Sequence, residues 1–299
     1  MNKIIEKYDN VDYRVLSIES CKDEYDKFTK ELQDRRKCGL NNEYEVFGDN
    51  IDSISIKCGF QAMTAIVLFI PYMTEEKIKF SKKSNLSSHA CSIDYHLIAK
   101  NLMSNIVMDL KNEYPENNYY IQCDNGPYNE RFFAIKSGLG KKSTNSTIIN
   151  DVYGSYGFIG LIITDAMIKE YKTQEKHCNH CGECIKKCPS KAISSEGIDF
   201  NRCISYLTQK KKLSETEEQL LKSQNKIFGC DVCQEVCHEN KNKKYSNIED
   251  FKRDLLYNIE LEDIEYLSNR EFKRKFSDRN FSWKGKNIIA RNISIGRGK

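Results

Sequence analysis

The chain has 299 residues, a formal net charge of +4 and a hydrophobic fraction of 39%. This length is enough for about two domains whose cores need no disulfide bonds. The small net charge gives no overall signature of nucleic-acid binding, and the longest apolar run, residues 65–70, is too short to cross a membrane. The charged start of the chain is unlike a secretory or transit segment. We therefore expect a cytoplasmic monomer with no membrane partner.

Residues 1–170 predict alternating strands and helices. Residues 62–70 are apolar and rich in branched side chains, which is typical of a buried strand ending at Pro71. A helix is expected from Asp94 to about Tyr114, because apolar residues recur there at helical spacing. Further along, we expect a strand over 119–122, a turn at C-D-N-G-P, a helix over 128–137, and strands over 146–149 and 158–164. This alternation indicates an α/β domain.

Eight of the 13 cysteines lie between Cys178 and Cys237. Such crowding in an intracellular chain indicates metal binding rather than a disulfide framework. The first run has the spacing C-x2-C-x2-C-x3-C-P, and a lone cysteine and a C-x2-C-x3-C run follow it. This spacing is typical of two [4Fe-4S] clusters, where the fourth cysteine of a run ligates the other cluster. We therefore assign one cluster to Cys178, Cys181, Cys184 and Cys237, and the other to Cys188, Cys203, Cys230 and Cys233.

Zinc is the alternative metal for these cysteines, but zinc sites favour paired C-x2-C units around an intervening loop. The three histidines His177, His180 and His238 flank the cysteines, and with eight thiolates available we expect them to be surface or supporting groups. Residues 171–243 thus form a predicted double-[4Fe-4S] ferredoxin-like domain. The scattered cysteines are expected to be small buried apolar residues: Cys21, Cys38, Cys58, Cys91 and Cys123.

Residues 244–299 predict a short helical tail that is polar except for an apolar patch at 283–289. From Arg270 to Lys299 the chain has ten Lys or Arg residues and two acidic ones. A basic stretch of this kind is either a solvated surface or a phosphate-binding one. The predicted fold class is therefore α+β, with an N-terminal α/β domain, a two-cluster domain and a basic helical tail.

Seven stretches of sequence carry a resemblance. Two lie in the cluster region, R-C-I-S-Y-L-T (202–208) and I-F-G-C-D-V-C-Q-E-V-C (227–237). The other five are S-I-D-Y-H (92–96), C-D-N-G-P-Y-N-E-R (123–131), G-S-Y-G-F-I-G-L-I-I-T-D (154–165), L-S-N-R-E-F-K-R-K-F (267–276) and S-W-K-G-K-N (282–287). Together these stretches resemble the epoxyqueuosine reductase family, and the similarity spans about residues 60–295.

The resemblance implies a corrinoid-binding first domain like that of reductive dehalogenases. It implies an enzyme that uses cobalamin and iron–sulfur clusters to reduce epoxyqueuosine to queuosine in tRNA. The implied partners are tRNA and a low-potential electron donor of ferredoxin or flavodoxin type. It also implies that Asp124 is the catalytic proton donor, although the residues alone favour a turn-capping aspartate before Gly126. His96 is expected to be structural or to line the site. The implied cobalamin contacts are Ser87, Ile148, Ile159, Ser205, Glu235 and Val236.

Three features depart from the family pattern. Residues 140–145 read G-K-K-S-T-N where the family usually has G-W-x-G-K-N, and His238 replaces a proline. The family also continues into helical repeats that help to grip tRNA, whereas this chain stops at Lys299. Two other functions therefore stay open: a corrinoid iron–sulfur reductase acting on another small electrophile, and a non-catalytic [4Fe-4S] electron-transfer protein.

Overall fold

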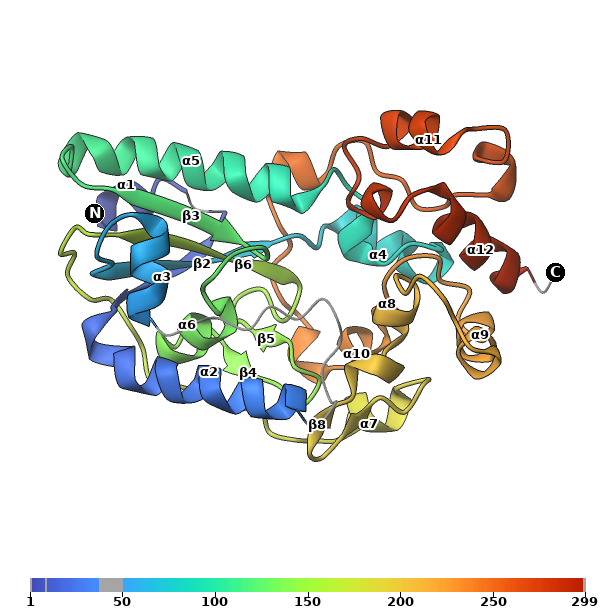
Figure 1. Ribbon diagram of the computed structural model, residues 1–299, viewed down its shortest axis with the longest axis horizontal. Coiled ribbons are helices and arrows are strands. Elements are labelled where there is room, and N and C mark those ends of the chain that lie inside the picture. Colours follow the sequence, from blue (N-terminus) through green and yellow to red (C-terminus); the bar gives the residue numbers. More distant parts are fainter. Residues whose placement is uncertain (1, 9, 38–50, 298–299) are drawn as a thin grey trace. The chain divides into compact units, whose positions relative to one another are not determined.

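The computed structural model describes residues 2–8, 10–37 and 51–297, and Figure 1 shows their helices and strands. The chain divides into two compact units, each assembled from separate segments. The first unit contains Met1–Pro71, His96–His180 and Asn242–Lys244, and the second contains Tyr72–Tyr95, Cys181–Lys241 and Tyr245–Lys299. Among the helices of the described ranges, none is long and apolar enough to span a membrane.

The first unit is built on a four-stranded sheet in the order β1-β2-β6-β3. Its strands are β1 (Asp12–Ser17), β2 (Thr64–Pro71), β6 (Gly157–Thr164) and β3 (Tyr119–Cys123). All three neighbouring pairs are antiparallel, and β2 pairs with β6 from Thr64 opposite Thr164 to Pro71 opposite Gly157. The predicted mixture of helices and strands is confirmed, but it forms an antiparallel sheet instead of the parallel one that such alternation usually gives.

Helices lie on both faces of this sheet. On one face, Tyr25 of α2 (Lys22–Lys37) and Phe133 of α6 (Glu130–Lys136) pack into a core that includes Val67 of β2. Helix α5 (Tyr95–Glu113) lies on the other face. It packs closely there, since a Cβ added to Gly160 of β6 would be 2.9 Å from the sulfur of Met103 of α5. Because both faces are covered, β2 is buried along its whole length, as its continuous apolar run predicted.

The other elements predicted for this unit are confirmed, with small shifts at their ends. The predicted helix at 94–114 is α5, the strand at 119–122 is β3, and the helix at 128–137 is α6. The predicted strand at 146–149 contains β5 (Ile148–Ile149), and the predicted strand at 158–164 is β6, which begins one residue earlier. The elements without a sequence prediction are β1, α2, α1 (Asn2–Ile5), α3 (Ile51–Cys58) and β4 (Lys141–Lys142).

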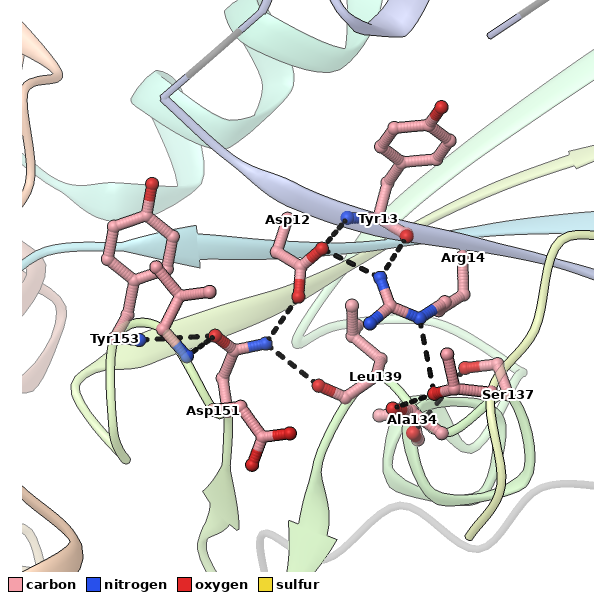
Figure 2. Close-up of polar contacts among 12 residues, drawn as sticks. Asp12, Tyr13, Arg14, Ala134, Ser137, Leu139, Asp151 and Tyr153 are labelled. Atoms are coloured by element: carbon pink, nitrogen blue, oxygen red, sulfur yellow. Dashed lines mark hydrogen bonds and ion pairs between the residues drawn. The ribbon is translucent and has the colours of Figure 1, made fainter. Parts of the chain in front are cut away.

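A buried asparagine ties β1 to the hairpin of β4 and β5. The side-chain amide of Asn150 donates to Oδ2 of Asp12 and to the carbonyl of Leu139, each at 2.8 Å (Figure 2). Its oxygen accepts the backbone N–H groups of Val152 and Tyr153. Arg14 Nη1 donates to the other oxygen of Asp12 at 2.7 Å. The hydrogen-bonding capacity of Asn150 is therefore used between elements far apart in sequence.

The second unit contains short helices and one small hairpin. The core of this unit includes Leu86, Phe228, Phe272, Phe281 and Ile289. Several apolar residues of the predicted tail are therefore buried against two earlier segments of the chain, whereas Trp283 of the predicted apolar patch is 55% exposed. The division into residues 1–170, 171–243 and 244–299 stays a prediction. The helices and strands of the second unit are α4 (Glu75–Phe80), α7 (Glu183–Lys187), β7 (Ile193–Ser194), β8 (Gly197–Ile198), α8 (Ile204–Leu207), α9 (Glu215–Lys222), α10 (Val232–Glu235), α11 (Asn269–Lys275) and α12 (Lys286–Gly296).

The scattered cysteines have mixed environments. Cys21 and Cys91 are buried, as predicted, whereas Cys58 and Cys123 are partly exposed. Cys38 lies outside the described residues. Burial raises the pKa of the Cys21 thiol to about 12, so this side chain is a neutral core residue at physiological pH.

Candidate functional site

Asp124 lies on the loop between β3 and α6, immediately after the end of the strand. Its side chain is 58% exposed, and its Oδ2 lies 3.3 Å from Nε2 of His96. Asn125 Nδ2 lies 3.0 Å from the same nitrogen of His96. The loop therefore presents a carboxyl group to solvent beside an imidazole, and such a pair can hold and transfer a proton. His96 thus lies next to Asp124, and the expectation that it is structural or lines the site stays a prediction.

The backbone at Asp124 adopts an unusual conformation. Its φ of 69° lies in the left-handed region, which aspartate tolerates better than most residues other than glycine. Two residues later, a Cβ added to Gly126 would lie 2.0 Å from Oε1 of Gln122, so only glycine fits there without displacing that side chain. The turn signal read from C-D-N-G-P is thus confirmed, and close packing explains its glycine.

Gln122 and Glu130 brace this loop from its two ends. Gln122 is 3% exposed, and its amide donates to the carbonyl of Tyr128 at 2.7 Å and accepts the Tyr128 N–H at 3.1 Å. Glu130 Oε1 accepts the backbone N–H of Asp124 at 2.6 Å and the amide of Gln122 at 3.1 Å. Burial raises the pKa of Glu130 to about 8, and the charge of Asp124 adds to this effect. Sequence reasoning did not single out either residue.

The structure brings several of the predicted cluster cysteines together in the second unit. Helix α7 carries Cys184 and packs against α10, which carries Cys233. Cys184, Cys203 and Cys233 all contact a small apolar cluster that contains Cys188. Gly182 precedes α7 with a φ of 79°, a left-handed conformation suited to the sharp turn between Cys181 and Cys184. Cys178 belongs to the first unit.

Backbone N–H groups point at the sulfur atoms, as expected for thiolate ligands of iron–sulfur clusters. Cys178 Sγ accepts from the N–H of His180 at 3.4 Å, and Cys188 Sγ accepts from the N–H of Ala192 at 3.3 Å. Burial raises the pKa of Cys203 and raises that of Cys230 to about 12, while backbone hydrogen bonds to both sulfurs lower them. Electrostatic coupling links Cys230 with Cys203 and Cys188. Both the donor atoms and these hydrogen bonds fit [4Fe-4S] clusters.

The two histidines near the start of the cysteine run contact the altered loop of the first unit. Thr144 Oγ1 lies 3.0 Å from Nδ1 of His180, and Lys142 forms an isolated bridge with His177. Ser143 hydrogen bonds to Asn145, and its hydroxyl also donates to the carbonyl of Thr147 at 2.7 Å. Residues 143–147 therefore form a compact polar turn between β4 and β5. His238 lies in the second unit, where its Nδ1 is 3.6 Å from Cys181 Sγ.

Two of the predicted cobalamin contacts lie in the first unit. Ile159 is partly exposed on β6, so its side chain fits a ligand contact. Ile148 is buried in β5, where a Cβ added to Gly140 would come within 2.4 Å of it, so it has little surface to offer a ligand. Both positions stay predictions.

The other four predicted contacts lie in the second unit. Ser87 is fully buried, and its hydroxyl lies 2.8 Å from Nδ1 of His89. Ser205 and Val236 are partly exposed and Glu235 is exposed, so these three side chains fit a ligand contact better than Ser87 does. These positions also stay predictions.

Comparisons with known proteins agree with the resemblance. A family model described as a 4Fe-4S double cluster binding domain matches residues 177–240, which confirms the predicted two-cluster segment. The epoxyqueuosine reductase of Lactococcus garvieae is 29% identical over 284 residues, covering 92% of this chain and 80% of that protein. That of Cyclobacterium marinum is 31% identical over 229 residues, covering 75% of this chain and 74% of that protein.

The fold also matches a solved structure. The crystal structure of an epoxyqueuosine reductase with a tRNA-Tyr epoxyqueuosine-modified stem loop superposes with a TM-score of 0.80 at 23% identity. The match covers 98% of this chain and 80% of that chain. The chain spans 80% of the length of the Lactococcus garvieae protein but 53% of that of the Bacillus cereus epoxyqueuosine reductase.

Proposed function

Because the chain belongs to the epoxyqueuosine reductase family, we propose that it reduces the epoxide of epoxyqueuosine in tRNA to the alkene of queuosine. This reaction consumes two electrons and two protons, and the epoxide oxygen leaves as water. The observation that carries the proposal is the exposed carboxyl group of Asp124 beside His96, on a loop that buried side chains brace. In its acid form, Asp124 donates a proton to the epoxide oxygen as the carbon–oxygen bond breaks. His96 keeps that carboxyl group oriented.

The cysteine residues present in the chain fit the cofactors that this chemistry needs. We assign the eight cysteines between Cys178 and Cys237 to two [4Fe-4S] clusters, in the two sets that their spacing gives. Cobalamin is the proposed second cofactor, and among the contacts that the resemblance implies, the buried Ser87 and Ile148 offer it the least surface. When bound, the clusters pass low-potential electrons one at a time and the corrinoid cobalt delivers them to the substrate. A ferredoxin or flavodoxin is the proposed electron donor.

The proposed macromolecular partner is tRNA. The structure with a bound stem loop supports this proposal, since it shares the fold of this chain. The basic stretch from Arg270 onward supplies cations that contact phosphates, and each such contact makes binding weaker as salt rises. We expect the affinity for tRNA to fall by at least about tenfold between 50 and 200 mM salt. An affinity that does not change over this range would argue against phosphate contacts.

The test of the proposed function is the substitution Asp124→Asn. The protein is loaded with iron and cobalamin without oxygen, and conversion of epoxyqueuosine in tRNA is followed by mass spectrometry of the released nucleosides. We expect the variant to lose about 100-fold or more of its turnover rate, because an amide cannot donate the proton as an acid. Its iron content and cobalamin affinity are expected to match those of the wild type.

A matched control exists on α2. Asp34 is 56% exposed and pairs with Lys37, so Asp34→Asn removes an equally exposed carboxylate far from the loop in sequence. This control is expected to turn over tRNA at the wild-type rate. If Asp124→Asn also does so, Asp124 is not the proton donor.

The altered sequence at 140–145, part of which lies in the polar turn 143–147, favours a second candidate substrate, because it differs from the family pattern. We propose, as this alternative, that a small epoxide or a related electrophile is reduced in place of tRNA. Wild-type protein that reduces the free epoxyqueuosine nucleoside but not modified tRNA would establish the alternative. Equal loss of both activities in Asp124→Asn would place both reactions at one site.

A further inference from the structure

We infer that Glu130 is a positioning residue that fixes the loop carrying Asp124 in the conformation used for the reaction. Its place at the first position of α6 puts it six residues beyond Asp124, yet its Oε1 accepts the Asp124 N–H at 2.6 Å. The inference rests on the proposed function, because that function gives Asp124 its role. Glu130 itself acts only through Asp124, not on the substrate.

The hydrogen bonds around Glu130 explain how the loop keeps an unfavourable backbone conformation. A residue other than glycine at a φ of 69° persists only where surrounding contacts hold it. The contact from Glu130 holds the amide of Asp124, and Gln122 donates to the same glutamate oxygen at 3.1 Å. Gln122 in turn is fixed by two hydrogen bonds to the backbone of Tyr128. The start and the end of the loop are therefore coupled through Glu130.

The charge state of Glu130 sets how strongly it holds this amide. Four ionisable groups bear on it: Asp124 raises its pKa, Arg131 lowers it, Tyr120 of β3 interacts with its charge, and His96 lies beside Asp124. Burial is the largest effect and brings the pKa to about 8, so the acid form prevails at pH 7. Ionisation above pH 8 turns the bond from the Asp124 N–H into a charge-assisted one, which is stronger. The hydrogen bond from the Asp124 N–H to Glu130 should therefore become stronger as pH rises, and the loop should be held more firmly.

Amide hydrogen exchange at single residues tests this directly, without any turnover. The variants are Glu130→Ala, which removes the acceptor, and Glu130→Gln, which keeps an acceptor oxygen that cannot ionise. We expect the Asp124 amide to exchange about tenfold faster in Glu130→Ala and near the wild-type rate in Glu130→Gln at pH 7. Between pH 7 and 9, the protection factor should rise in the wild type and stay flat in Glu130→Gln.

Glu24→Ala is the matched control. Glu24 also pairs with a residue of α6, because it accepts from Lys136 Nζ at 2.7 Å, but no hydrogen bond joins it to the described loop residues 122–128. The control should leave exchange at Asp124 unchanged. Unchanged exchange at Asp124 in Glu130→Ala would overturn the inference, as would a rise with pH that persists in Glu130→Gln.

Turnover separates this inference from the proposed function. If the wild type reduces epoxyqueuosine in tRNA, we expect Glu130→Ala to lose about tenfold in kcat with KM within twofold, and Glu130→Gln to restore most of the rate. Full turnover in Glu130→Ala would overturn the positioning role. If the wild type gives no turnover while the exchange pattern appears, the proposed function fails and Glu130 is shown to brace the loop.

Discussion

Replacing the buried Lys77 by methionine is expected to stabilise the protein at neutral pH and to destabilise it at high pH. Lys77 is 1% exposed, and its Nζ donates to the carbonyl of Tyr72 and to Ser92 Oγ, each at 3.0 Å. Burial lowers its pKa from 10.5 to about 7; Cys91 and Asp231 act in the opposite direction, while Arg279 acts in the same direction. The folded protein therefore holds an amine that is half neutral near pH 7.

The size and the sign of the effect follow from this pKa difference. Between pH 7 and 10.5 the unfolded chain binds a proton that the folded chain does not, so the free energy of unfolding rises with pH. The slope approaches about 1.4 kcal/mol per pH unit, and the whole shift corresponds to about 5 kcal/mol. Methionine removes this penalty but also removes the hydrogen bonds from Lys77 to the Tyr72 carbonyl and to Ser92 Oγ, which costs about 1–2 kcal/mol for each. The variant should thus be more stable by about 2 kcal/mol at pH 7.

Thermal unfolding followed by circular dichroism measures this difference in iron-loaded protein kept free of oxygen. Because a change of 1 kcal/mol shifts Tm by about 2–4 °C in chains of this size, the expected shift is about 4–8 °C upward at pH 7. The two Tm curves should cross between about pH 8 and 9. Lys79→Met is the matched control, because Lys79 lies on the same helix with 67% of its side chain exposed. Parallel curves for the wild type and Lys77→Met would refute the reasoning.

Three further substitutions test the fold and the site. Gly126→Ala places a methyl group 2.0 Å from Gln122 Oε1, so we expect at least about tenfold slower turnover with unchanged iron content. Wild-type turnover would contradict the close packing of Gly126 against Gln122. Asn150→Ala removes four hydrogen bonds and is expected to lower the free energy of unfolding by about 2–3 kcal/mol, measured as a fall in Tm. A negligible fall would mean that water replaces the amide. Cys203→Ala should reduce bound iron from about eight atoms to about four, whereas Cys21→Ala should leave it unchanged; full iron in Cys203→Ala would remove Cys203 from the ligands.

The elements that the sequence predicted are those with a dense apolar pattern. Strand β2 has eight consecutive buried residues, and α5 repeats apolar residues over nineteen positions. Each pattern is therefore enough by itself to predict the element. Strand β1 escaped prediction because its two buried residues, Val15 and Leu16, are adjacent and do not alternate. Helix α2 is mostly charged, and the residues that anchor it, Tyr25 and Phe28, are two aromatics in a polar stretch.

The candidate site was predictable only in part. The cysteine spacing pointed to two clusters through chemistry alone, and the family motif pointed to Asp124, which by itself reads as a turn residue. No sequence pattern predicted that Gln122 and Glu130 hold the loop, because their hydrogen bonds depend on how the end of β3 and the start of α6 are placed in the fold. The antiparallel order of the strands likewise depends on long connections that local patterns do not describe.

The pairing of β2 with β6 also bears on how the protein reaches its fold during synthesis. Pro71 pairs with Gly157 and Thr64 with Thr164, so one edge of a mostly apolar strand has no partner until the ribosome has added about ninety more residues. At typical elongation rates, this delay lasts about 5–20 s. An exposed apolar edge of this kind is a template for association with other chains. We therefore expect nascent chains that stop before β6 to bind chaperones or aggregate, and the yield of soluble protein to rise when translation beyond β2 is fast.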